Sequence, residues 1–166
     1  GAFSKLLSAR RIKTIAADGD YAAIGKLYRK ITADRETNIL PLIIDLANPA
    51  PATGMNNKER PSFLNRIKNT DIGLALALIH HLCLGKNIPL CSTAEMFSAS
   101  CKNLVIEFVP KTDPKSQLLL LNKKDIYANY TSENFETAFS KFFKTLQKQP
   151  IPGTKRVLYL MQRING

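Results

Sequence analysis

Short apolar segments alternate along this chain with segments in which apolar residues recur at helical spacing. An apolar segment of four to eight residues bounded by polar or turn-forming residues is typical of a buried β-strand. Segments of this kind predict four strands, over residues 12–18, 38–46, 72–78 and 103–109. The first two of these apolar segments each contain an acidic residue at or near their end, Asp18 and Asp45.

The helical segments lie between these strands. Apolar residues three and four positions apart predict helices over residues 2–10, 21–31, 61–68, 89–101 and 131–144. Asp20 and Thr131 precede two of them and have side chains suited to capping a helix N-terminus. The segment 47–61 is rich in Pro, Asn and Gly and predicts a long loop. The last twenty or so residues predict an antiparallel hairpin around Pro-Ile-Pro-Gly-Thr.

This order of elements predicts a three-layer α/β fold in one domain, residues 1–166, with a mostly parallel sheet and a C-terminal antiparallel hairpin. Ligands of such sheets bind beyond the carboxyl ends of the strands. Five polar side chains are expected at that edge: Asp18, Asp45, His80, His81 and Glu107.

The net charge and the cysteine content indicate which kinds of partner and which cellular compartment suit the chain. The formal net charge is +11, which favours phosphates, nucleic acid or acidic partners, although the basic residues are scattered and equally suit solvated helix faces. Three cysteines without CxxC spacing favour neither a zinc site nor a disulfide framework, and this suits a cytoplasmic location. No apolar segment is long enough to cross a bilayer, so no membrane partner is expected.

Several motifs resemble a known family. They are AADGD at 16–20, DLANPAPATGMNNKERPSFLNRIK at 45–68, LALALIHHL at 74–82, LVIEFVPKTDP at 104–114 and RVLYLMQR at 156–163. Together with the order of elements, they resemble the class I S-adenosylmethionine-dependent methyltransferases, and most closely a bacterial subgroup labelled nodulation-protein-like methyltransferases. The resemblance implies a Rossmann-like fold and S-adenosylmethionine as cofactor.

The resemblance also implies that one strand is missing. Class I enzymes begin with a central strand and a glycine-rich turn, and this chain starts just after that turn, with Gly1 as its last glycine or an unrelated residue. The missing strand would lie between the strands at 12–18 and 72–78. We therefore expect an N-terminally incomplete domain, or one whose missing strand comes from a partner or a strand-exchanged neighbour.

By the same resemblance, five residues bind the cofactor: Gly1, Asp18, Gly19, Asp45 and Leu46. Asp18 would hold the ribose hydroxyls, because a carboxylate accepts two hydrogen bonds from a vicinal diol. Asp45 would face the adenine. The alternatives are a capping or turn acid for Asp18 and a loop-bracing acid for Asp45. Gly19 permits a tight turn and close approach of a ligand.

The methyl acceptor would lie near His80, His81, Asn48 and Glu107. A neutral imidazole can remove a proton from the acceptor, and we assign this catalytic role to His80 in preference to His81, the alternative being a structural hydrogen bond. Asn48 in its proline-rich loop could hold a target nitrogen or belong to a rigid loop. Glu107 could line the substrate side or be a buried paired acid. Adjacent histidines have the wrong spacing for a chelating pair, so no metal site is predicted.

The sequence therefore predicts a methyltransferase domain with an unidentified acceptor, of which this chain could be an inactive fragment. Nucleic acid is a less favoured acceptor, because the chain has no tryptophan and few aromatic residues near the expected site. The alternative is a non-catalytic basic module that binds RNA or an acidic protein. Steep salt dependence of binding without cofactor affinity would distinguish it.

Overall fold

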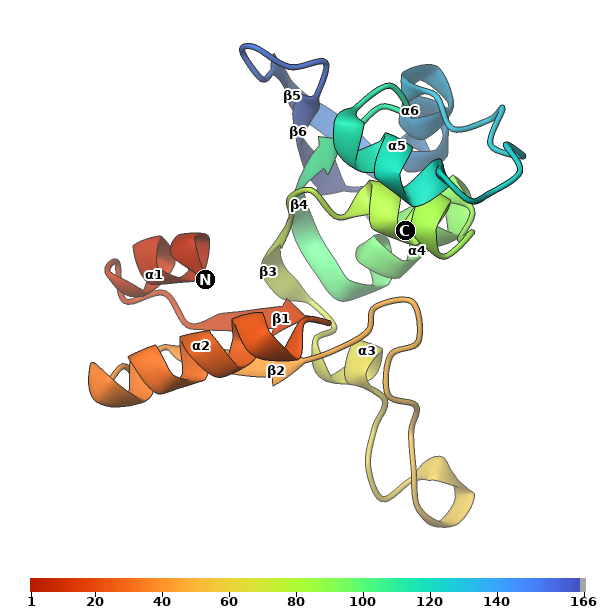
Figure 1. Cartoon of the computed structure of the whole chain (residues 1–166). Helices are drawn as coiled ribbons and strands as arrows, with labels where there is room; N and C mark the ends of the chain where they lie inside the picture. The colour runs from red at the N-terminus through yellow and green to blue at the C-terminus, as the bar shows by residue number, and fades with distance from the viewer. Residues whose placement is uncertain (165–166) are drawn as a thin grey trace. The chain divides into compact units, whose positions relative to one another are not determined.

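The computed structural model describes residues 1–164, which form two compact units, Gly1–Ala50 and the chain from Pro51 onward. Figure 1 shows the course of the chain through both units. The helices are α1 Ala2–Ser8, α2 Tyr21–Ala33, α3 Phe63–Arg66, α4 Leu90–Ser100, α5 Pro114–Leu120 and α6 Ser132–Ser140, with a 3₁₀ turn at Met55–Asn57 and a π-helical turn at His81–Gly85. The strands are β1 Thr14–Asp18, β2 Ile39–Ile43, β3 Thr70–Ala75, β4 Cys101–Phe108, β5 Phe143–Pro150 and β6 Val157–Arg163.

The first unit contains one strand–helix–strand crossover. β1 and β2 are parallel, and Thr14 to Asp18 pair in order with Ile39 to Ile43. The expected cap is confirmed, because Asp20 Oδ1 accepts hydrogen bonds from the backbone N–H groups of Ala22 (2.7 Å) and Ala23 (3.1 Å). The apolar face of α2 covers the sheet with Leu27 and Ile31, which pack on Ile39. This crossover places the carboxyl ends of β1 and β2 at the same edge.

The second unit contains a four-stranded sheet in the order β3-β4-β6-β5. β3 and β4 are parallel, whereas β6 is antiparallel to both β4 and β5. The predicted C-terminal hairpin is thus confirmed. The predicted α/β fold with a parallel sheet is confirmed as well: β1 with β2 and β3 with β4 form the parallel pairs, and the two antiparallel pairs of the described chain both involve β6 of the hairpin.

The main hydrophobic core lies on the face of this sheet that α4 and α6 cover (Figure 1). Residues of β4 alternate between the two faces, so that Leu104, Ile106 and Phe108 all point to the core and are almost fully buried. Phe135 and Phe139 of α6 belong to the same core cluster and have no exposed surface. The predicted inner face of this helix is therefore confirmed at its first positions, but the helix ends at Ser140 and Phe143 already belongs to β5.

Two helical segments were absent from the sequence prediction. One is α5, where Asp113 caps the helix by accepting a hydrogen bond from Lys115 N (2.9 Å) and Pro114 occupies the first turn. The other is the turn at 79–85, where the predicted strand at 72–78 has already ended at Ala75. No helix among residues 1–164 is long and apolar enough to span a membrane.

β1 and β3 are edge strands in the part of the chain that the structure describes, and the missing strand expected beside them stays a prediction. Within residues 1–164, β1 pairs only with β2 and β3 pairs only with β4. The expectation that the segment 12–18 forms a buried strand is wrong for β1, because Ile15 remains 44% exposed and the strand ends in three exposed or partly exposed residues. An unpaired edge of this kind leaves backbone donors and acceptors open to another strand.

Candidate functional site

The first candidate position is the carboxyl end of β1. Asp18 is the last residue of that strand and its side chain is exposed. Asp18 Oδ1 accepts a hydrogen bond from Asp20 N (3.0 Å), which closes the tight turn into α2. Asp20, and not Asp18, caps the helix. The structure therefore identifies Asp18 as a turn acid at an exposed strand end; its contact with a ribose stays a prediction.

Asp45 and its neighbours follow the end of β2, at the same edge of the two-stranded sheet. The chain continues the pairing past the strand, since Ile44 N donates to Asp18 O (3.0 Å). Asp45 Oδ1 then accepts from Ala47 N (2.9 Å), and Asp45 O accepts from Asn48 N (3.0 Å). Asp45 thus braces its loop, as the alternative interpretation proposed, while its carboxylate lies near the strand end that carries Asp18.

The remaining predicted residues of this unit lie in different surroundings. Gly19 is exposed beside the β2 end, and a Cβ atom there would lie 3.8 Å from Ile44 O, which leaves room for a side chain. Gly1 instead packs against α2, where a Cβ would lie 2.8 Å from Leu27 Cδ1. Leu46 is half-buried and Asn48 is exposed in the turn after β2. The cofactor and substrate roles of these four residues stay predictions.

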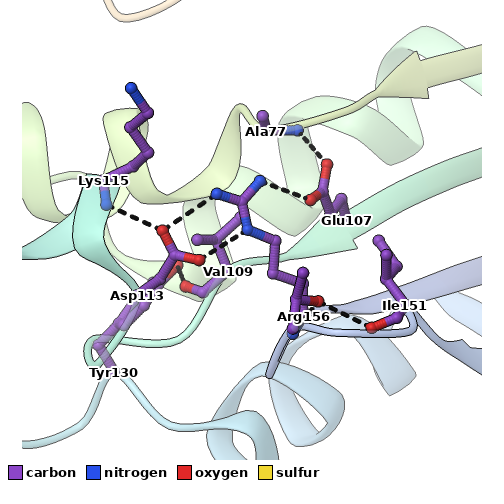
Figure 2. Close-up of polar contacts among 9 residues, drawn as sticks. Ala77, Glu107, Val109, Asp113, Lys115, Tyr130, Ile151 and Arg156 are labelled. Atoms are coloured by element: carbon purple, nitrogen blue, oxygen red, sulfur yellow. Dashed lines mark hydrogen bonds and ion pairs between the residues drawn. The ribbon is translucent and has the colours of Figure 1, made fainter.

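The second candidate position is a buried ion cluster at the carboxyl ends of β3 and β4, drawn in Figure 2. The guanidinium of Arg156 lies between two carboxylates. It donates from Nε to Asp113 Oδ2 (2.7 Å), from Nη2 to Asp113 Oδ1 (3.0 Å) and from Nη1 to Glu107 Oε1 (3.0 Å). Both acids are at least nine-tenths buried. The other Glu107 oxygen accepts from Ala77 N (2.7 Å), so the buried paired acid is what the structure shows for Glu107.

The ion pair shifts the pKa values of Asp113 and Arg156 in opposite directions, as expected when each group stabilises the charge of the other. Hydrogen bonding to Arg156 lowers the pKa of Asp113 below its ordinary value, and burial opposes this only in part. The same contact with Asp113 raises the pKa of Arg156 further above its ordinary value. Asp113 and Arg156 are therefore both charged at neutral pH.

The two histidines lie beside this cluster in a helical turn and differ sharply in burial. His80 is 1% exposed, and its Nδ1 has no hydrogen-bond partner among the described residues, whereas His81 is exposed. Their ring centroids are 4.3 Å apart. Burial favours His81 for direct contact with an acceptor, which runs against the preference for His80. The catalytic role of His80 stays a prediction, and no group of residues that could hold a metal occurs within residues 1–164.

We expect His80 to make stability depend on pH between about 4 and 6.5. Burial first, and then the nearby His81 and Arg156, lower its pKa from 6.5 to about 4. In this window the unfolded chain binds a proton that the folded chain does not, so the free energy of unfolding decreases as the pH falls. The loss should amount to roughly 1–3 kcal/mol. Urea unfolding of His80→Gln should lack this component, while the control His81→Gln retains most of it, because burial is the largest cause of the shift; equal profiles for all three proteins would contradict the assignment.

Sequence reasoning missed Arg156, Asp113 and Ala77. Arg156 is separated from its partners by 43 and 49 positions, and no local pattern reveals such pairs. A signal did exist for Asp113, since Asp-Pro before an apolar segment is a typical helix start. Ala77 has a positive φ of 48°, which its residue type does not announce.

Comparison with known proteins gives one clear relative in sequence. Over 151 residues, 91% of this chain, the sequence is 35% identical to the nodulation protein NoeA of Rhizobium meliloti (strain 1021). The aligned region makes up 31% of NoeA, so the chain spans about a third of its relative. No family model matches the chain. The likeness to nodulation proteins that the sequence motifs indicated is confirmed.

Solved structures resemble the chain in fold. The PH0226 protein from Pyrococcus horikoshii OT3 superimposes with a TM-score of 0.68 at 14% identity, covering 99% of this chain and 77% of that protein. WbdD, described as a bifunctional kinase-methyltransferase, superimposes with a TM-score of 0.66 at 10% identity, covering 98% of this chain and 32% of WbdD. A second WbdD crystal structure gives a TM-score of 0.67 at 11% identity. These superpositions establish the α/β, Rossmann-like fold.

Proposed function

From its kinship with the nodulation protein NoeA and its Rossmann-like fold, we propose that the chain is a domain of an S-adenosylmethionine-dependent methyltransferase. One observation carries the proposal. An exposed carboxylate, Asp18, ends a parallel strand and is followed by Gly19 and a capped helix, which is the position where α/β sheets bind nucleotide-like ligands. The three cysteines are free thiols, which suits the reducing cytoplasm we propose for it.

We assign the cofactor to the edge where β1 and β2 end. The ribose hydroxyls would donate to Asp18, since Oδ1 has one backbone donor and an ionised carboxylate accepts several hydrogen bonds. Asp45 and Leu46 would contact the adenine from the next loop. Gly19 has no side chain to obstruct the approach of the ligand. S-adenosylmethionine supplies an activated methyl group on a sulfonium, so the protein has mainly to hold donor and acceptor in line.

The acceptor side is assigned to the double-histidine segment, residues 78–85; the substrate role of Asn48, which belongs to the first unit, stays a separate prediction. His81 is exposed and can accept a proton or a hydrogen bond from an acceptor, while His80 lies buried behind it in the neutral form. Glu107 acts here by holding the segment, because both of its oxygens are engaged. The acceptor itself is unidentified.

Calorimetric titration with S-adenosylhomocysteine tests the cofactor assignment. We expect micromolar binding to the unsubstituted chain and affinity roughly 10- to 100-fold lower for Asp18→Ala, because two charge-assisted hydrogen bonds are lost. Asp34→Ala is the control: that aspartate ends α2, and its nearest ion-pair contact is 3.8 Å away, from Lys5. Equal affinities for all three proteins would remove Asp18 from the cofactor site.

Titration with a single-stranded RNA at two salt concentrations tests the alternative function. The net charge of +11 is the observation that favours a basic binding module. Tight RNA binding that weakens steeply with salt, together with no heat from S-adenosylhomocysteine, would support that module and overturn the methyltransferase proposal.

A further inference from the structure

We propose that Arg156 is a positioning residue that holds the double-histidine segment in place through Glu107 and Ala77. The role assigned to that segment, contact with the acceptor, rests on the proposed function. The positioning itself rests only on the geometry of the cluster. It gives the C-terminal hairpin, which is distant in sequence, a direct influence on the histidines.

The guanidinium links the loop after β4 to the paired ends of β4 and β6. Arg156 lies just before β6, Asp113 lies in the loop after β4, and Glu107 lies near the end of β4. Figure 2 shows the guanidinium between the two carboxylates, with the Ala77 backbone beyond Glu107. Three of its N–H groups are used, two of them in a bidentate pair with Asp113. A planar fork of donors can satisfy both acids at once, which a lysine ammonium at the end of a flexible stem cannot do.

Glu107 passes this constraint to the backbone of the next loop. Its Oε2 accepts from Ala77 N at 2.7 Å, and Ala77 has a φ of 48°. A non-glycine residue is uncommon in this left-handed region and persists there only where its surroundings impose it. Here the imposed contact is the carboxylate that Arg156 orients.

The double-histidine segment starts directly after Ala77. Leu78 O accepts hydrogen bonds from His81 N (2.9 Å) and Leu82 N (3.3 Å), so the first turn of the segment begins one residue after the held backbone. A change of the Ala77 conformation would therefore rotate the start of this turn. That rotation would alter which imidazole is buried and which is exposed.

The burial of the cluster also argues for a geometric role. The Arg156 side chain is 21% exposed, and the Glu107 and Asp113 side chains are 9% and 8% exposed. Desolvating such groups costs several kcal/mol per ion, and apolar residues of similar size often stabilise a protein as well or better. Apolar residues could not accept the hydrogen bond from Ala77 N, whereas the Glu107 carboxylate accepts it in a direction that Arg156 fixes.

Histidine NMR and amide hydrogen exchange on the full chain test the proposal. The chain has two histidines, so each imidazole can be followed separately. In Arg156→Lys we expect exchange at Ala77 and Leu78 to accelerate roughly tenfold, because the hydrogen bond to Glu107 weakens. The titration midpoint of His80 should also rise from about 4 toward 6.5 as water reaches the ring.

Arg163→Lys is the matched control. Arg163 is the last residue of β6, the strand that Arg156 precedes, and it also donates to two partners, Ser98 O (3.0 Å) and Asn69 Oδ1 (3.1 Å). It should leave both readouts at Ala77 and His80 unchanged. A merely structural role for Arg156 would instead accelerate exchange throughout β4 and β6, and that result, or unchanged readouts in a folded Arg156→Lys protein, would overturn the proposal.

Glu107→Gln covers the case in which Arg156→Lys does not fold. Glutamine keeps the shape but has a single acceptor oxygen, so the contacts with Arg156 and Ala77 N cannot both persist, and the same local acceleration is expected. Calorimetry with S-adenosylhomocysteine on the same samples separates the two proposals. If the local changes at Ala77 and His80 occur but S-adenosylhomocysteine does not bind, the positioning role is retained and the methyltransferase proposal is refuted. If S-adenosylhomocysteine binds but the local changes do not occur, the methyltransferase proposal is retained and the positioning role is refuted.

Discussion

Phe135→Ala is expected to lower the free energy of unfolding of the second unit by about 3–5 kcal/mol. Phe135 has no exposed surface and lies at the centre of an aromatic cluster. Its ring centroid is 4.3 Å from that of Phe139, 5.0 Å from that of Tyr159 and 5.1 Å from that of Phe108. Truncation removes contacts with α6, β4 and β6 at once and leaves a cavity that these rigid rings fill poorly.

Urea unfolding followed by circular dichroism measures this loss. Leu118→Ala is the control within the same unit, since Leu118 is 61% exposed on α5 and its truncation should change the free energy of unfolding by no more than about 0.5 kcal/mol. If the two substitutions cost the same, Phe135 does not hold α6 onto the sheet, and the core would have to be assigned elsewhere.

The core was predictable because its determinants are local in sequence. The period-two pattern of β4 and the helical spacing of Phe135, Ala138 and Phe139 identify the buried faces without knowledge of their partners. Boundaries were less predictable. The segment 72–78 is apolar throughout, yet β3 stops at Ala75, and two residues later Ala77 takes a left-handed conformation with its N–H bonded to Glu107.

The candidate site was predictable only as a set of strand ends. Asp18, Asp45 and Glu107 do lie where parallel strands terminate, as the topology requires. Their surroundings depend on residues far away in the chain, and burial separates the adjacent histidines although their local sequence is the same. The positioning role proposed for Arg156 would account for this difference, and a single charge just before a strand gives no sequence signal for its partners.

Asp113→Ala should be nearly as damaging as the loss of Phe135, with an expected decrease of about 3–5 kcal/mol in the free energy of unfolding. Removing one member of a buried ion pair leaves its partner charge without full compensation, and Arg156 would retain Glu107 alone. The same substitution removes the cap of α5, because Asp113 Oδ1 also accepts from Lys115 N. Asp113→Asn separates these effects, since asparagine caps a helix but carries no charge.

A control variant and acid unfolding both test whether the buried ion pair of Asp113 stabilises the fold. Asp125→Ala is the matched control. Asp125 also forms an ion pair, with Lys111, but it is largely exposed, so its loss should cost at most about 1 kcal/mol. Acid unfolding provides the second. Arg156 lowers the pKa of Asp113 from 3.8, so the folded state gains stability above that pH and loses it as the pH falls through the lowered value. Asp113→Asn should remove this acid-dependent loss of stability. If the loss persists in Asp113→Asn, or if Asp113→Ala costs no more than Asp125→Ala, the cluster does not stabilise the fold. Holding the backbone at Ala77 would then be the role left to it.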